Sequence, residues 1–470
     1  MLEWVDHFWS ERVSGSVPLF LYQERSRIFP DPVLMLSIVR QSAKIFYRSN
    51  LTETCYVGRT LMVSSSTRAI NTSGYKILRK LPSQVTKIQS VLRQSGTIAL
   101  SYASKATPKS KKVVGSWLLT CSGMVFVAVA LGGITRLTES GLSMVTWKLL
   151  GEKMPSTEAD WIEEFEKYKQ FPEFKISNTE ISLQEFKRIW WMEYLHRTWG
   201  RLIGAAFILP ATFFWARGWL DSQAKIRILI LGSLIGMQGL MGWYMVKSGL
   251  EDRFDGPSDV PRVSQYRLAS HLGLALIIYS GFFYSALDYL MPAKRVAVDY
   301  FSSEKVKTHV TQGLRRLRVM AYSSKGLVFL TALSGAFVAG MDAGLVYNTF
   351  PKMADKWIPD DILAISPVLR NFTENATTVQ FDHRILGITT LSMITATWLF
   401  SRKYVLPGRG SKAAMALLCF GYLQVILGIT TLLHHVPIPL AASHQSGSLA
   451  VLSSALWLCH ELKYVKHLPK

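Results

Sequence analysis

Residues 190–201 read W-W-M-E-Y-L-H-R-T-W-G-R, and residues 379–388 read V-Q-F-D-H-R-I-L-G-I. Each stretch places a His-Arg pair, with a glycine four residues after the histidine, at the start of a long apolar segment. Ionisable residues within a membrane span are costly, so their recurrence at matching positions points to a function. The pattern indicates two copies of one membrane-embedded unit.

The apolar segments are long enough to cross a bilayer. Of the 470 residues, 49% are hydrophobic, and a window of about 19 residues predicts eight spans. These cover roughly residues 114–134, 198–217, 226–247, 269–291, 323–344, 383–401, 412–433 and 440–460. We therefore expect an all-α polytopic membrane protein whose eight transmembrane helices form two tandem four-helix bundles related by a pseudo-twofold axis.

Further residues come into register when the first four spans are laid over the last four. The matching pairs are Gly132 and Gly335, Glu139 and Asp342, Gly141 and Gly344, Gln238 and Gln424, Gly242 and Gly428, and His271 and His444. Their common order makes duplication the simplest explanation. The predicted organisation is an N-terminal extension (1–112), a first unit (113–291), a basic linker (292–322), a second unit (323–462) and a C-terminal tail (463–470).

The charge distribution predicts the topology. The net charge of +21 is concentrated at the N-terminus and in alternate loops, which is typical of the inner side of a membrane rather than of nucleic-acid binding. Both termini and the basic linker are therefore expected inside, and the loops at 135–197, 248–268 and 345–382 outside. The four cysteines are scattered without a C-x-x-C pair, so neither an iron–sulfur nor a zinc site is expected.

The N-terminal extension contains a segment without acidic residues. From Thr54 to Thr138 there is no Asp or Glu, while Arg, Lys, Ser and Thr recur. This composition is typical of a mitochondrial presequence; a basic tail at a membrane surface is the alternative. Residues 1–53 fit neither description, and the sequence leaves the true start open.

Four histidines stand near the outer ends of the even-numbered spans. They are His196 and His271 in the first unit, and His383 and His444 in the second. Two histidines that approach one depth from parallel helices suit the two faces of a heme iron, so the spacing predicts one bis-histidine heme site in each unit. A hydrogen-bonded core histidine is the competing interpretation for any single position. It is preferred for His434 and His435, which have no counterpart in the first unit.

The two units differ beside the first histidine. Glu193 lies one helical turn before His196, whereas Gln380 occupies the equivalent position before His383. A carboxylate at one site only suggests that the first unit handles protons or positive charge during a reaction. A surface carboxylate at a helix N-terminus is the alternative for Glu193.

Other polar residues in the units have two interpretations. Arg197 and Arg384 are candidates for binding heme propionates, with snorkelling to lipid headgroups as the alternative. Gln238 and Gln424 can form a hydrogen bond between helices or support a histidine, and the hydrogen bond between helices is the preferred interpretation.

Several motifs carry a family resemblance over roughly residues 115–462. They are L-G-G-I-T-R-L-T-E-S-G-L-S-M from Leu131, W-W-M-E-Y-L-H-R-T-W-G-R from Trp190, G-W-Y-M-V-K-S-G-L from Gly242, D-A-G-L-V-Y-N-T-F-P from Asp342 and F-D-H-R from Phe381. In these the chain resembles the mitochondrial form of the heme A synthase family. The chain departs from the family in having Leu149-Leu150 where proline is usual, and it lacks the cysteine pair that some bacterial relatives carry in the first outer loop.

The resemblance implies a function and assigns roles. It implies an inner-membrane enzyme of mitochondria that oxidises a ring methyl of heme O to the formyl of heme A, for cytochrome c oxidase assembly. His196 and His271 would hold the substrate heme, Glu193 would be the catalytic carboxylate, and His383 and His444 would hold heme B. Expected partners are a heme O synthase, oxidase assembly factors, the lipid bilayer and an electron donor that the sequence does not identify, with a ferredoxin system as one candidate; a homo-oligomer is left open.

Two other functional classes compete with this hypothesis. A bis-heme membrane cytochrome b that only passes electrons would carry two equivalent heme B groups and leaves the difference between Glu193 and Gln380 without a purpose. A repeat-built transporter would use the histidines as proton or metal sites, and it would carry no heme.

Overall fold

The computed structural model describes residues 106–251, 262–294, 303–406 and 408–467. The predicted presequence and the problem of residues 1–53 lie outside these ranges, and so do residues 295–302 of the predicted linker. The described chain consists of helices and their connections, with a single isolated bridge between Met353 and Lys356. The expectation of an all-helical chain is confirmed for this part.

Eight long helices overlap the eight predicted spans. They are α4 (Pro108–Leu137), α7 (Leu183–Ala216), α8 (Ser222–Gly249), α9 (Gln265–Leu290), α10 (Glu304–Gly340), α12 (Ala376–Ser401), α13 (Gly410–Leu433) and α14 (Ile438–Glu461). In the described residues, six of them are long and apolar enough to cross a membrane, and α12 and α14 fall outside that group. Both carry many polar residues, including His383 and His444. The fold is that of a polytopic membrane protein.

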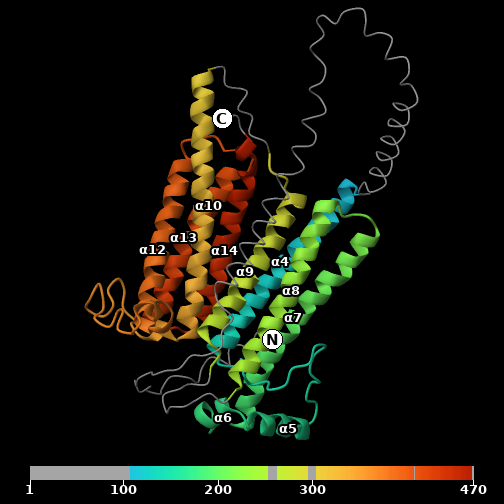
Figure 1. Cartoon of the computed structure of the whole chain (residues 1–470), viewed down its shortest axis with the longest axis vertical. Coiled ribbons are helices and arrows are strands. Elements are labelled where there is room, and N and C mark those ends of the chain that lie inside the picture. The colour runs from blue at the N-terminus through green and yellow to red at the C-terminus, as the bar shows by residue number, and fades with distance from the viewer. Residues whose placement is uncertain (1–105, 252–261, 295–302, 407, 468–470) are drawn as a thin grey trace, which may run out of the picture. The chain divides into compact units, whose positions relative to one another are not determined.

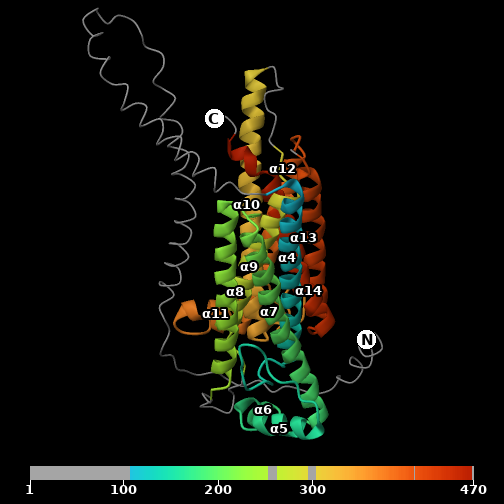
Figure 2. The ribbon, with the colours of Figure 1, turned by 90° about the vertical axis from the view of Figure 1, so that its right-hand side faces the viewer.

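Helix packing follows the sequence repeat (Figure 1, Figure 2). In the first half, α4 and α8 each pack against both α7 and α9. In the second half, α10 and α13 each pack against both α12 and α14. Corresponding helices therefore have corresponding neighbours, and each half is a closed ring of four helices.

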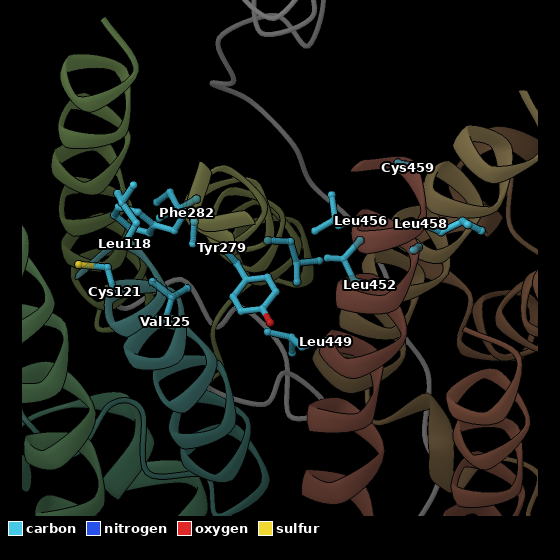
Figure 3. Packing of buried hydrophobic residues seen from close by; sticks show 14 of the residues in the cluster. Leu118, Cys121, Val125, Tyr279, Phe282, Leu449, Leu452, Leu456, Leu458 and Cys459 are labelled. Carbon is cyan, nitrogen blue, oxygen red and sulfur yellow. The ribbon is translucent and has the colours of Figure 1, made fainter. Parts of the chain in front are cut away.

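The two halves share one apolar core. Contacts between them join α9 to α10, α4 to α14 and α9 to α14. Figure 3 shows Val125 of α4, Phe282 of α9 and Leu452 of α14 within this core, all buried. The Tyr279 hydroxyl lies 2.6 Å from the Ser453 hydroxyl, which adds a polar link between α9 and α14. Because lipid is as apolar as leucine, close packing of this kind holds membrane helices together.

Two short helices cap the first half at the beginning of α7 (Figure 1). They are α5 (Glu158–Tyr168) and α6 (Pro172–Ser177). One face of α5 buries Trp161, Phe165 and Tyr168, so α5 is an amphipathic helix. Phe165 stacks on Phe186 of α7 at 4.9 Å between ring centroids, and Trp161 packs edge-on against Trp190 at 5.0 Å.

All eight long helices begin before their predicted spans, and the difference is largest for α7 and α10. α7 starts at Leu183 behind a capping box formed by Ser182 and Glu185, and its first turns are held by the aromatic contacts with α5. α10 starts at Glu304, so residues 304–322 of the predicted linker belong to a helix. Leu314 and Leu317 in this extension are fully buried in the common core. In both cases tertiary packing supports a helix where the segment is too polar to be identified as a span.

Candidate heme sites

The four predicted histidines face each other in pairs across the two rings. His196 lies on α7 and His271 on α9, which are diagonal partners in the first ring. His383 on α12 and His444 on α14 hold the same positions in the second, with ring centroids 6.4 Å apart and ring planes at 89°. The structure thus brings together each pair that the sequence predicted.

A glycine of a neighbouring helix lies against each imidazole. A Cβ atom built on Gly132 of α4 would lie 2.9 Å from Cε1 of His196, and one on Gly335 of α10 would lie 3.3 Å from Cε1 of His383. Gly242 of α8 and Gly428 of α13 stand in the same way against His271 and His444, at 3.4 and 2.7 Å. These are the glycine pairs that the repeat alignment matched. Their missing side chains leave the histidine rings room inside the bundle.

The paired geometry fits a heme iron. A metal–imidazole bond is about 2 Å long, so two rings that coordinate one iron from opposite sides have centroids about 6 Å apart. The spacing of His383 and His444 agrees with this value. In the described part of the chain, no group of three or more His, Cys, Asp and Glu residues is placed to hold a bare metal ion. A porphyrin supplies four nitrogen ligands to its iron, so it requires only a pair of histidines from the protein.

The two halves hold their histidines differently at Nδ1. Nδ1 of His383 lies 2.8 Å from the Ser334 hydroxyl, and Nδ1 of His444 lies 3.1 Å from the backbone oxygen of Gln424. Nδ1 of His196 and Nδ1 of His271 are buried without a hydrogen-bond partner. Ser334 could not be predicted from the sequence, because a lone serine in an apolar helix carries no signal of its own.

The two glutamines connect helices, as expected. Gln238 Nε2 donates to the backbone oxygen of His271 at 3.0 Å, and Gln424 Nε2 donates to that of His444 at 2.8 Å. Both bonds tie a histidine-bearing helix to its neighbour. The preferred interpretation of these glutamines is therefore confirmed.

Glu193 is a buried carboxylate that accepts hydrogen bonds from neighbouring groups. It is 2% exposed and lies well inside α7, so the alternative of a surface residue at a helix N-terminus is wrong. Its Oε2 accepts from the Ser143 hydroxyl at 2.8 Å and from the Met144 backbone N–H at 2.7 Å. Its Oε1 accepts from Arg197 at 2.5 Å. These partners fix the carboxylate on the face of α7 that carries His196.

Gln380 makes the equivalent connection in the second half with an amide. Its Nε2 donates to the backbone oxygens of Ala343 and Tyr347, and its Oε1 accepts from Arg384 at 3.1 Å. The loop after α10 thus presents carbonyl oxygens where the loop after α4 presents N–H and O–H groups. Each loop matches its own side chain, so Glu193 and Gln380 are not interchangeable.

The two arginines bind these loops as well. Arg197 donates to the backbone oxygens of Met144 and Thr146, and Arg384 donates to those of Tyr347 and Lys352. The predicted propionate contacts of both arginines stay a prediction.

His434 and His435 are exposed at the end of α13 and belong to neither histidine pair.

A second buried carboxyl lies in the outer segment of the first half. Glu173 of α6 is 6% exposed, and its Oε2 has no hydrogen-bond partner. The Tyr168 hydroxyl, which accepts from Asn178 at 2.7 Å, interacts with the Glu173 carboxyl. Burial, and after it the charge of Glu193, raises the pKa of Glu173 to about 8.

Replacing Glu173 with glutamine is expected to change the pH dependence of stability. The folded chain keeps a proton that the unfolded chain releases between the ordinary pKa of 4.5 and about 8, so wild-type stability falls as pH rises through this window. The variant does not undergo this loss of folding free energy, which amounts to about 5 kcal/mol at most in wild type. Melting temperatures in detergent at about pH 5.5 and about pH 8.5 should differ less for the variant than for wild type.

The exposed Glu180 in the same segment provides the control. Glu180→Gln should leave the wild-type pH dependence unchanged. If Glu173→Gln behaves like Glu180→Gln at both pH values, the raised pKa is wrong.

Comparison with known proteins identifies the family. The family model for COX15-CtaA, described as cytochrome oxidase assembly protein, matches residues 115–456. The chain is 55% identical over 385 residues to the human protein named heme A synthase COX15, covering 82% of this chain and 90% of the relative. It is 40% identical over 381 residues to the yeast heme A synthase COX15 of Saccharomyces cerevisiae (77% and 78% covered). It is 44% identical over 354 residues to the heme A synthase of the bacterium Nitrosospira multiformis (75% and 94% covered). The chain therefore belongs to the COX15-CtaA family of cytochrome oxidase assembly proteins, the heme A synthase family.

Proposed function

We propose that this protein is a heme A synthase that oxidises a ring methyl of heme O to the formyl group of heme A. The observation that carries the proposal is a pair of facing histidines in each half, with a buried carboxylate beside only one pair. Two successive hydroxylations of the methyl carbon give a hydrated aldehyde, which becomes the formyl group by loss of water. The names of the relatives support the same activity.

In this proposal the first half binds the substrate. His196 and His271 hold heme O from its two faces, and Glu193 acts at the reacting edge. Ser143, Met144 and Arg197 hold the Glu193 carboxylate in place, so it meets the substrate without reorganisation. Its burial excludes bulk water, which strengthens its interaction with positive charge that develops during oxidation. Glu193 is therefore placed to accept a proton or to stabilise that charge.

The second half binds a resident heme B through His383 and His444. When bound, this heme relays electrons to or from the first half. The neutral Gln380 beside it suits a group that changes redox state without proton chemistry on the ring. Arg197 and Arg384, near the outer ends of their helices, remain candidates for propionate binding alongside their loop contacts.

We place the protein in the mitochondrial inner membrane, with eight spans in two pseudo-twofold-related bundles and both termini in the matrix. The basic alternate loops and the relatives from human and yeast support this placement. In this placement α12 and α14 cross the membrane as members of the second ring, and their histidine-bearing faces point toward the heme rather than toward lipid. The proposed partners are a heme O synthase, assembly factors of cytochrome c oxidase and a ferredoxin-type electron donor.

Extraction of the hemes from purified protein tests this function. Wild type should yield heme B together with heme O or heme A, identified by chromatography and mass. His196→Ala should lose only heme O and heme A, and His383→Ala should lose heme B. Heme B at both sites, without any conversion of heme O, would instead identify a bis-heme electron carrier, which a pair of histidines in each half allows.

A further inference from the structure

Hydrogen bonds in the second half fix the tautomer of His383. The Ser334 hydroxyl has a single proton. It donates this proton to the backbone oxygen of Thr331, three residues earlier in α10, with 2.8 Å between the two oxygen atoms. Its oxygen is then left to accept from Nδ1–H of His383 at 2.8 Å. The proton of the imidazole therefore sits on Nδ1, and the lone pair of Nε2 is free to bind iron.

His444 is fixed in the same way by a different partner. Its Nδ1 lies 3.1 Å from the backbone oxygen of Gln424, and a carbonyl oxygen can only accept. Nδ1 therefore carries the proton, and Nε2 of His444 also has its lone pair free. Both histidines of the second half are held in the tautomer and ring orientation that axial ligation needs.

The first half lacks both of these interactions. Nδ1 of His196 and Nδ1 of His271 have no hydrogen-bond partner. In the repeat alignment, which pairs Gly132 with Gly335, Ser334 corresponds to Leu131, which cannot accept a hydrogen bond. A metal-bound histidine that donates its other N–H is a more basic and better oriented ligand, and loss of such a partner typically costs about 10- to 100-fold in metal affinity.

We propose that these Nδ1 hydrogen bonds divide the labour between the two halves, with Ser334 as the positioning residue that makes the second half retain its heme. The first half, without them, binds heme more weakly and releases it. This inference rests on the proposed function, since a substrate must enter and a product must leave one site while a relay heme stays at the other.

Transfer of heme from the purified full-length holoprotein to excess apomyoglobin tests the proposal. Wild type should release heme in a fast phase and a slow phase, assigned to the first and second halves with His196→Ala and His383→Ala. Ser334→Ala should accelerate the slow phase about tenfold and leave the fast phase unchanged. It should also raise the midpoint potential of the second-half heme, because a less basic ligand stabilises ferric iron less.

Three further variants complete the test. Ser334→Thr keeps the hydroxyl and should restore slow release. Ser324→Ala is the matched control, because Ser324 is a buried serine of the same helix whose hydroxyl lies 2.9 Å from Thr397 and not from a histidine. Leu131→Ser supplies the missing hydroxyl and should slow the fast phase, and it decides the matter if Ser334→Ala fails to fold.

Several results would overturn the proposal. They are release in a single phase from wild type, slow release from Ser334→Ala at the wild-type rate, or equal acceleration by Ser324→Ala. Failure of the proposed function gives a different result, namely two hemes B and no conversion of heme O. The effect of Ser334 on release can still be measured in that case.

Discussion

Glu193→Gln is expected to lower heme A formation by at least about 100-fold, in line with loss of a positioned acid–base group. The substitution is isosteric and removes the charge beside His196 while leaving the four histidines intact. Heme O should therefore still bind and accumulate, and heme B should be retained. The measurement is heme A per protein after expression, with heme content followed by absorption spectra of the purified variant.

This result separates catalysis from loop attachment. The amide of glutamine would meet the Ser143, Met144 and Arg197 donors, so about 1–3 kcal/mol of stability is lost as well. Glu374→Gln is the control, because Glu374 also pairs with an arginine one helical turn away and accepts from Tyr266. It should preserve activity. Normal heme A formation by Glu193→Gln would show that Glu193 only holds its loop.

Arg197→Met is expected to destabilise the protein strongly, by about 3–5 kcal/mol, because it leaves the Glu193 carboxylate buried without its charge partner. The Arg197 and Glu193 side chains are 9% and 3% exposed. The substitution also removes the donors to Met144 and Thr146, so the loop after α4 loses its attachment to α7. The measurement is the thermal unfolding midpoint of the purified protein in detergent.

Arg201 provides the matched control one turn along α7. It donates to the backbone oxygens of Lys148 and Leu149 in the same loop. Its interaction with the Glu152 carboxylate is electrostatic, whereas Arg197 donates directly to Glu193. Arg201→Met should cost much less stability. Adding Glu193→Gln to Arg197→Met should recover part of the loss, since no buried charge then remains. Equal losses in the two single variants would contradict a buried charge pair at Glu193.

The sequence predicted the helices and the paired histidines because both depend on periodic or repeated features. Hydropathy located the eight long helices of the described residues, and the alignment matched each glycine that lies against a histidine. It also matched Glu139 with Asp342, which both adopt a left-handed backbone with φ of 52°. Duplication therefore supplied information that a single copy would not contain.

The remaining features depend on contacts between distant segments. The early starts of α7 and α10 come from aromatic and apolar packing that a hydropathy window does not register. The donors to Glu193 include the backbone N–H of Met144. A backbone donor cannot be predicted from the type of the residue that carries it. Ser334 is polar where the first half has the apolar Leu131. The importance of this difference is visible only in the structure, where the Ser334 hydroxyl lies 2.8 Å from His383 Nδ1.

The contact between the halves has an evolutionary consequence. Exchanging the halves turns the contact of α4 with α14 into that of α10 with α9, and it maps the contact of α9 with α14 onto itself. Each half therefore contacts the other through the same surface, as the two subunits of an isologous dimer do. In a dimer of identical subunits one gene position must specify both copies of a residue. Fusion into one chain removes that constraint, so glutamate at 193 and glutamine at 380 can coexist in every molecule.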